Sequence, residues 1–299
     1  MSWFIFALLG YFLYSLVTIS NKFLLRQRAM TKPLVFTFWV SLFSIFTFIL
    51  APFGLHWPGI GWLIFDISAG LIYFVALWAF YHALDINEAS RAASIIGGLT
   101  PIFVLAFSCF FWGESLGWLQ LVAFLLLLAG GFWISLEKNQ NGFKEKLKGI
   151  NFIALAIILH AVYYLMLKYL FGYQDFITGF IWSRLGMALA ALVVLANPTW
   201  RKMIASSART ATAGLGYLMV GSKVAAGFGS LFVSLAIAKG NVALVNALQG
   251  SEYAFLFLMT ILLSRKWPDI LREKLNGAII AQKIVAIIII CVGLALIAL

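Results

Sequence analysis

The sequence predicts an all-α integral membrane protein with ten transmembrane helices. Of its 299 residues, 64% are apolar and 10% are charged, whereas about a quarter of the residues of a soluble domain are charged. The apolar residues gather in runs of about 20, enough to cross roughly 30 Å of hydrocarbon. These runs are continuously apolar rather than alternating, which favours helices over barrel strands. The runs cover residues 2–25, 33–51, 60–84, 89–112, 117–136, 150–171, 176–196, 213–238, 241–264 and 278–299.

The net charge of +11 could indicate a nucleic-acid partner, but its distribution indicates a membrane partner instead. Basic residues gather in the odd-numbered connections between the runs, whereas the even-numbered connections carry only Lys239. Such a bias marks the cytoplasmic face, where anionic lipids attract cations. It predicts a protein of the cytoplasmic (inner) membrane with both termini outside. The odd connections carry Arg26, Arg28, Lys32, Lys138, Lys144, Lys146, Lys148, Arg201, Lys202, Arg209, Arg265, Lys266, Arg272 and Lys274.

The chain divides into two halves that match in register. A polar linker, residues 137–149, separates a predicted repeat at residues 1–136 from another at 150–299. Each half holds five runs. Because five is an odd number, the second half enters the membrane from the opposite side and has the inverted orientation. Inverted repeats are common in carriers, whose sites lie between the repeats near the midplane. The matched segments are 14–22 with 160–168, 38–41 with 181–184, 83–85 with 236–238, and 98–103 with 250–255.

One hairpin, residues 88–135, carries a family resemblance. Thr100-Pro101, the Gly113-Glu114 turn and a helix beginning near Gln120 resemble EamA-type members of the drug/metabolite transporter superfamily. The second copy departs, with Tyr253 at the position of Pro101 and Arg265-Lys266 in place of the Gly-Glu pair. The resemblance implies ten helices and a secondary carrier that exports amino acids or other small metabolites.

That resemblance also implies cytoplasmic termini, whereas the charge count places both termini outside. We follow the count, because fourteen basic residues against one is a large bias. The Gly113-Glu114 turn itself is expected to be an exposed structural corner.

Three ionisable residues near the middle of predicted spans are the first candidates for a site. Burying such a group in the bilayer costs at least about 3 kcal/mol, so each needs a partner, a cavity or a function. Glu252 and Lys223 either bind substrate or a coupling proton, or neutralise each other as a structural pair. Arg184 either binds an anion or ties helices together through backbone carbonyls.

Polar neighbours extend this set. Gln249 and Asn241 lie at helical spacings from Glu252 and predict a polar stripe along the ninth span. His160 and Tyr164 share a face of the sixth span, with His160 either a satisfied polar residue or a proton relay. Lys168 follows on the same face and is either a further buried cation or a side chain that extends to the membrane interface.

Aromatic and small residues complete the candidates. Trp39, Trp78, Tyr81 and Trp182 would line a cavity if they lie on the inner faces of their spans. The Gly97-to-Pro101 segment of the fourth span is expected to open the backbone ladder or allow close packing. Lys283 is expected to extend toward the membrane interface, and Asp66 either does the same or lies at a cavity mouth.

These observations predict a secondary carrier for a small polar metabolite bearing an anion, such as an amino acid. Glu252 is the candidate for proton coupling, and no cofactor is expected. Cys and His lack metal-ligand spacing.

One alternative is a membrane enzyme acting on lipid or polyprenol substrates, with Asp85, Asn87 and Glu88 as its nearest approach to a polar cluster. Another is a carrier of lipid-linked intermediates, which a lateral opening between spans would favour.

Overall fold

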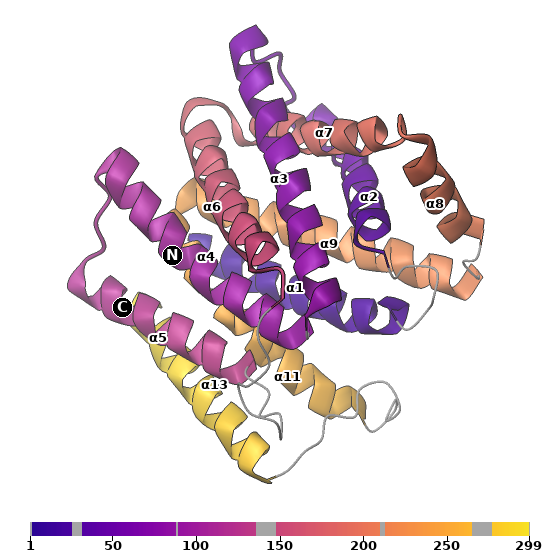
Figure 1. Cartoon of the computed structure of the whole chain (residues 1–299). Helices are drawn as coiled ribbons and strands as arrows, with labels where there is room; N and C mark the ends of the chain where they lie inside the picture. Colours follow the sequence, from indigo (N-terminus) through magenta and orange to yellow (C-terminus); the bar gives the residue numbers. More distant parts are fainter. Residues whose placement is uncertain are drawn as a thin grey trace.

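The computed structural model describes residues 2–25, 32–87, 89–135, 148–209, 213–264 and 277–298, and their regular structure is helical. Figure 1 shows the helices gathered into one bundle. In chain order they are α1 (Ser2–Leu25), α2 (Pro33–Phe43), the 3₁₀ helix η2 (Ser44–Phe53), α3 (Ile60–Ile86), α4 (Ala89–Trp112), α5 (Trp118–Ser135), α6 (Ile150–Tyr173), α7 (Phe176–Val194), α8 (Pro198–Arg209), α9 (Ala213–Lys239), α10 (Val242–Ala247), α11 (Gly250–Ser264) and α13 (Gly277–Ala298).

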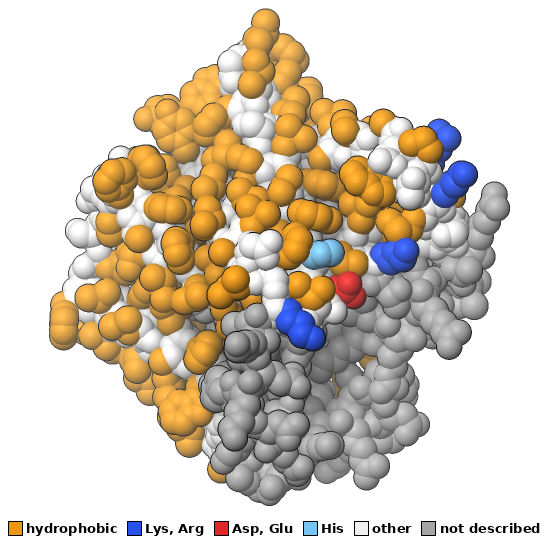
Figure 2. Space-filling model, in the orientation of Figure 1, with side chains coloured by type: hydrophobic (Ala, Val, Ile, Leu, Met, Phe, Trp, Pro, Cys, Tyr) orange, Lys and Arg blue, Asp and Glu red, His pale blue; other side chains and the backbone are white. Residues whose placement is uncertain are grey.

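The membrane-spanning character of the chain is confirmed. Within the described ranges, 9 helical segments are long and apolar enough to cross a bilayer, and a shorter apolar helix covers Trp118–Ile134. The outer surface is correspondingly apolar: in Figure 2 hydrophobic side chains cover most of the visible face, and the Lys and Arg side chains gather toward one region. An all-α, multi-pass protein with nine to ten spans follows.

The second span changes its helical form at mid-depth. It begins as α2 with Pro33 in the first turn, where a missing N–H costs nothing. From Ser44 it continues as η2, whose tighter winding rises about 2 Å per residue. The Ser44 hydroxyl donates to the carbonyl of Arg184 at 2.9 Å. The α-to-3₁₀ transition of this span is therefore fixed against α7.

The ninth span is broken, although the sequence predicted one continuous helix over 241–264. It divides into α10 and α11 at Leu248-Gln249. At the break the backbone makes tighter bonds, with the Gln249 amide donating to the Asn246 carbonyl at 3.1 Å. Gly250 approaches α5 closely there: a Cβ on Gly131 would lie 2.8 Å from the Gly250 Cα, and a Cβ on Gly250 would lie 2.8 Å from the Leu127 carbonyl oxygen.

The fourth span follows one of its two expectations. α4 runs unbroken through Pro101, so the backbone ladder does not open there. A proline removes a single backbone donor, and neighbouring helices can hold the span straight. The Thr100 hydroxyl donates to the Ile96 carbonyl at 2.7 Å, which satisfies one carbonyl of this turn. Close packing is present instead, because a Cβ on Gly97 would lie 2.6 Å from the Tyr253 hydroxyl of α11.

A further helix, α8, occupies part of the long connection between spans seven and eight. The Asn197 side chain caps it by accepting from the amide of Thr199 at 2.9 Å. Ile204 is buried on one side while Arg201 and Lys202 are exposed on the other. This division of apolar and basic faces is typical of a helix that lies in the membrane interface.

Close helix pairs organise the bundle (Figure 1). α1 packs along α9, α5 along α13, and α3 along both α6 and α7. Glycine makes the α3–α7 contact possible: a Cβ on Gly70 would overlap the backbone of Ser183 and Met187, and one on Gly186 would overlap Ile67. Around these contacts the helices leave a large central space.

Candidate functional site

A cavity of about 1090 Å³ lies at the centre of the bundle. Both halves of the chain line it, through α1, α2, η2, α3 and α4 from the first half and α6, α7, α9, α11 and α13 from the second. Its wall is mostly apolar, with a small number of polar and charged side chains. This composition is typical of ligand sites, where a few polar groups fix orientation.

Arg184 of α7 is buried on this wall without a carboxylate partner among the described residues. The guanidinium lies 5.3 Å from the ring centre of Tyr73 and 5.1 Å from that of Phe180. One terminal nitrogen donates to the Ser230 hydroxyl of α9, and Nε has no hydrogen-bond partner in the described part of the chain. The predicted tether to backbone carbonyls is absent there, since the bonded oxygen is a hydroxyl.

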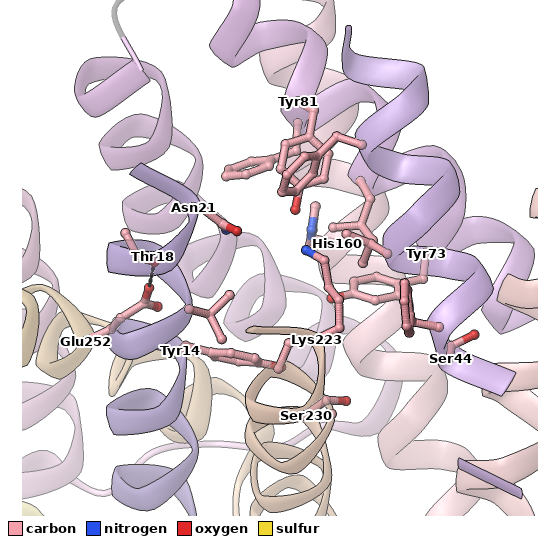
Figure 3. A pocket seen from close by; sticks show the side chains of 18 of the residues that line it. Tyr14, Thr18, Asn21, Ser44, Tyr73, Tyr81, His160, Lys223, Ser230 and Glu252 are labelled. Atoms are coloured by element: carbon pink, nitrogen blue, oxygen red, sulfur yellow. Dashed lines mark hydrogen bonds between the residues drawn. The ribbon is translucent and has the colours of Figure 1, made fainter. Parts of the chain in front are cut away.

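Lys223 extends from α9 into the same cavity (Figure 3). It is 7% exposed, and its ammonium lies 4.3 Å from the centre of the Phe36 ring, a cation–π contact. The alternative of a structural pair with Glu252 is not realised, because each group has another neighbour. Lys223 is therefore a second buried cation on the wall.

Glu252 approaches the cavity from the opposite side, in the first turn of α11. Its carboxylate accepts a hydrogen bond from the Thr18 hydroxyl of α1 at 3.0 Å (Figure 3). Glu252 lies in the first turn of α11, where the helix dipole favours negative charge. Within the described ranges, Glu252 thus has a polar setting without a neutralising cation.

His160, Tyr164 and Tyr81 also line the cavity. The Nδ1 atom of His160 lies 2.8 Å from the Ala156 carbonyl oxygen, and the ring packs edge-on to Tyr73 at 5.7 Å. This geometry agrees with the interpretation of a satisfied polar histidine. Its position on the wall also leaves it within reach of a bound molecule.

The predicted stripe on the ninth span is only partly formed. Gln249 and Glu252 face the cavity, but Asn241 does not. The break at Leu248-Gln249 destroys the helical phase that would align Asn241 with the other two. Asn241 instead caps α10 and donates to Glu114 at 3.0 Å.

Three tryptophans predicted as candidates lie outside the cavity lining. Trp39 packs against Phe38, and Trp78 stacks on His82. Trp182 donates through its indole nitrogen to the His56 carbonyl at 3.2 Å, at the protein surface. An aromatic residue carries no sign of which face of its helix is inward, so sequence spacing alone misplaced them.

Several lining residues were missed by the sequence analysis. Tyr14, Thr18 and Asn21 form a polar stripe on α1, and Tyr73 lies on α3 facing Arg184. The spacing of the first three, one helical turn apart, could have revealed them. Lys283 was expected to extend to the interface, but it is buried over the Phe257 ring at 4.8 Å and lines the cavity.

The two ends of the cavity differ. Lys32, Asp85 and Lys283 line it at the end where the basic connections lie. Toward the other end the helices are joined: the Tyr11 hydroxyl donates to the Val245 carbonyl at 2.9 Å, and Lys168 donates to the Gly240 carbonyl at 2.8 Å. The cavity is thus open toward the basic end and closed at the other.

The Gly113-Glu114 turn belongs to the closed end. Gly113 is exposed, as expected for a corner, and the half-buried Glu114 also accepts the hydrogen bond from Asn241. Lys168 does not line the cavity; it donates to the carbonyls of Ile237 and Gly240 at the end of α9. Both residues belong to the closed end.

Other candidates lie away from the cavity. Asp66 is fully buried and accepts from the Gln174 amide at 3.2 Å, so it neither extends to the interface nor reaches the cavity. Asn87 bonds the backbone of Lys148. Glu88 lies outside the described residues.

Residues 1–136 match the family model of the EamA-like transporter family. Over these residues, a little under half of the chain, the protein is similar to EamA-like transporters. That similarity implies membrane transport of a small molecule and disfavours the alternative of a lipid-acting membrane enzyme.

Comparison with solved structures gives the same architecture over the whole chain, with 28 matching chains. One, titled only as a crystal structure of a protein, shares 20% sequence identity at a TM-score of 0.66, covering 98% of this chain and 94% of that chain. At this identity the likeness shows the fold alone. A comparison with curated proteins gave no match.

Proposed function

We propose that this protein is a secondary carrier for a small metabolite bearing a carboxylate or another anion, such as an amino acid. The observation that carries the proposal is the excess of cations on the cavity wall. Arg184 and Lys223 are buried on the cavity wall, whereas the lining acids are the half-buried Glu252 and the exposed Asp85. A bound anion would supply the negatively charged partner that Arg184 lacks among the described residues, at a site where little water screens the electrostatic attraction.

Alternating access is the mechanism we propose, based on two inverted repeats, residues 1–136 and 150–299. Matching helix pairs support the repeats. α1 packs on α9 as α6 packs on α3, and α11 packs on α1 as α4 packs on α6. A site between such repeats can be exposed to either face when one half rocks against the other. Residues 137–147 of the proposed linker lie outside the described residues.

The orientation follows from charge. In the proposed placement in the inner membrane, the basic end faces the cytoplasm and both termini lie outside. The structure then has its cavity open to the cytoplasm, the state in which an exporter takes up its substrate. We accordingly favour export.

Glu252 is the proposed proton-coupling group. Of the two acids that line the cavity, Asp85 is exposed, whereas Glu252 is half-buried and accepts a hydrogen bond from a hydroxyl. Protonation would remove one negative charge opposite the substrate anion, so proton and substrate occupancy would be coupled by electrostatics.

The test is transport of a panel of radiolabelled amino acids by purified protein in proteoliposomes. Arg184→Gln should lower exchange of the transported anion by at least about tenfold, which corresponds to one charge-assisted hydrogen bond. Arg201→Gln, an exposed charge of α8 away from the cavity, serves as the matched control and should leave exchange unchanged. Exchange that persists unchanged in Arg184→Gln would overturn the anion site.

Proton coupling has its own readout. Glu252→Gln should abolish uptake driven by a pH gradient while exchange at equal pH continues. If the variant still accumulates substrate against a gradient when a pH difference is imposed, Glu252 is not the coupling group.

A further inference from the structure

One side of the cavity is open between η2 and α9. α9 packs on α1, α6, α7 and α10, and η2 packs on α2 and α7, but η2 and α9 share no extensive packing with each other. Side chains of both nevertheless line the central cavity. We call this lateral opening, bounded by Phe46, Ile49, Val224 and Phe228, the η2–α9 gap.

The walls of the gap are apolar and face outward. Phe46 is 60% exposed and Ile49 70% on η2, while Val224 is 55% and Phe228 54% exposed on α9. All four also line the cavity. In a membrane protein, exposed apolar side chains within a span face lipid, so the gap connects the cavity to the acyl chains.

The gap lies at the depth of the cationic centre. On the η2 side, the hydroxyl of Ser44 bonds the Arg184 carbonyl, two residues before Phe46. On the α9 side, Ser230 accepts from the guanidinium, two residues after Phe228. Lys223 is adjacent to Val224. Buried cations and the apolar gap are therefore neighbouring parts of one cavity.

The shape of this site differs from that expected for a compact polar metabolite. A compact anion needs the cations and an aqueous entry, and the basic end supplies both. A compact anion does not require an apolar opening to lipid at the same depth. Such an opening is suited to hydrocarbon, because a polar group placed there would be buried without hydrogen-bond partners.

We infer that the substrate is an anionic amphiphile, whose charged head meets Arg184 and Lys223 while its apolar tail lies in the η2–α9 gap. The inference rests on the proposed anion-carrying function and narrows its substrate class. Each methylene of an aliphatic tail that is removed from water makes the free energy of binding more favourable. The same chemistry could come from a soluble acylated metabolite or from an anionic membrane lipid.

A pair of probes with one headgroup tests this. N-acetylglycine and N-decanoylglycine are titrated against the whole protein in phosphatidylcholine nanodiscs, with thermal stabilisation as the binding readout. We expect the long-tailed probe to bind at least about tenfold more tightly in total aqueous concentration. Because the long tail also partitions into the lipid of the nanodisc, the tail advantage of the wild-type protein is compared with that of two variants.

The deciding variants are Gly227→Leu and Gly221→Leu. Both glycines have open space where a Cβ would lie, so neither substitution disturbs packing, but only Gly227 lines the cavity. Gly227→Leu should reduce the advantage of the long tail by at least about fivefold, because the side chain fills the gap. Gly221→Leu should show the same advantage of the long tail as the wild-type protein.

The outcomes separate the two proposals. An equal tail advantage in all three proteins would mean simple partitioning and would overturn the amphiphile inference while leaving the anion site intact. Binding of neither probe would overturn the anion site and the inference together. Nanodiscs with added phosphatidylglycerol then identify the source: competition with the probe indicates that a membrane lipid occupies the site, and lack of competition indicates a soluble amphiphile.

Discussion

Two helix pairs in corresponding positions of the proposed repeats behave differently. α3 packs tightly on α7, whereas their counterparts, α9 and the α2–η2 span, stand apart around the gap. The register of the matched segments places Lys223 at the position of Gly70, and Phe43 at that of Gly186. Glycine lets the backbones of α3 and α7 touch. Lys223 and Phe43 occupy the corresponding space on the open side and line the cavity.

The difference between the two pairs shows how one part of the bundle can be closed while another borders the cavity. Packing energy is concentrated in one pair, where small residues allow close contact. The other pair carries a cation and a large aromatic, which cannot approach so closely. The open pair therefore provides the cavity, while the closed pair holds the bundle together.

The largest expected effect is disruption of the closed pair. Gly70→Leu should destabilise the protein by more than about 3 kcal/mol, because its side chain would overlap backbone atoms that cannot move aside. The thermal unfolding midpoint in detergent measures this. Gly221→Leu, on α9 with open space around it, is the control and should unfold at the wild-type temperature. Equal midpoints for the two variants would refute the contrast between the pairs.

An intermediate effect is expected in accessibility. In a background of Cys109→Ser and Cys291→Ser, a lipid-soluble maleimide should label Phe228→Cys at least about tenfold faster than Ala191→Cys, since thiol reaction requires access. Phe228 is 54% exposed at the gap, whereas Ala191 of α7 is 0% exposed and lies outside the cavity lining. Ile49→Cys, on the other wall of the gap, should behave as Phe228→Cys does. Equally slow labelling at Phe228 and Ala191 would show that the gap is occluded in the membrane.

The smallest effect is expected at the closed end of the cavity. Glu114→Ala removes the bond to Asn241, worth about 1 kcal/mol, while leaving the Asn241 cap of α10 in place, and should raise labelling of the buried position Ala7→Cys by a water-soluble maleimide about fivefold. The matched control is Gln120→Ala, which loses a bond within the same hairpin, to the amide of Gly117. If the control raises labelling equally, the Glu114–Asn241 bond does not hold that end closed.

The sequence indicated three residues of the candidate site because charge in a membrane is scarce. Arg184, Lys223 and Glu252 were selected from their position within apolar runs, and all three line one cavity. The family resemblance was also predicted from residues 88–135, and the family match over residues 1–136 confirms it for that part of the chain. Both inferences rest on local signals, which need no knowledge of neighbours in space.

The failures have one physical origin. The tryptophans were misplaced because which face of a fully apolar helix points inward depends on its partners. Asn241 was misplaced because a break at Leu248-Gln249 changed the helical phase beyond it. Pro101, the strongest local breaker, left α4 intact, since tertiary contacts override a single missing hydrogen bond.

The sequence by itself determined that this chain crosses a membrane repeatedly, where its spans lie, and which few ionisable groups are buried in them. These features depend on the free energy of transferring each residue from water to the membrane, which is a property of the residue itself. Only the tertiary structure decided that η2 and α9 stand apart, that Glu252 binds Thr18 rather than Lys223, and that the cavity opens toward the basic end. Such features depend on how helices approach one another, and a contact between residues more than 200 positions apart has no local signal.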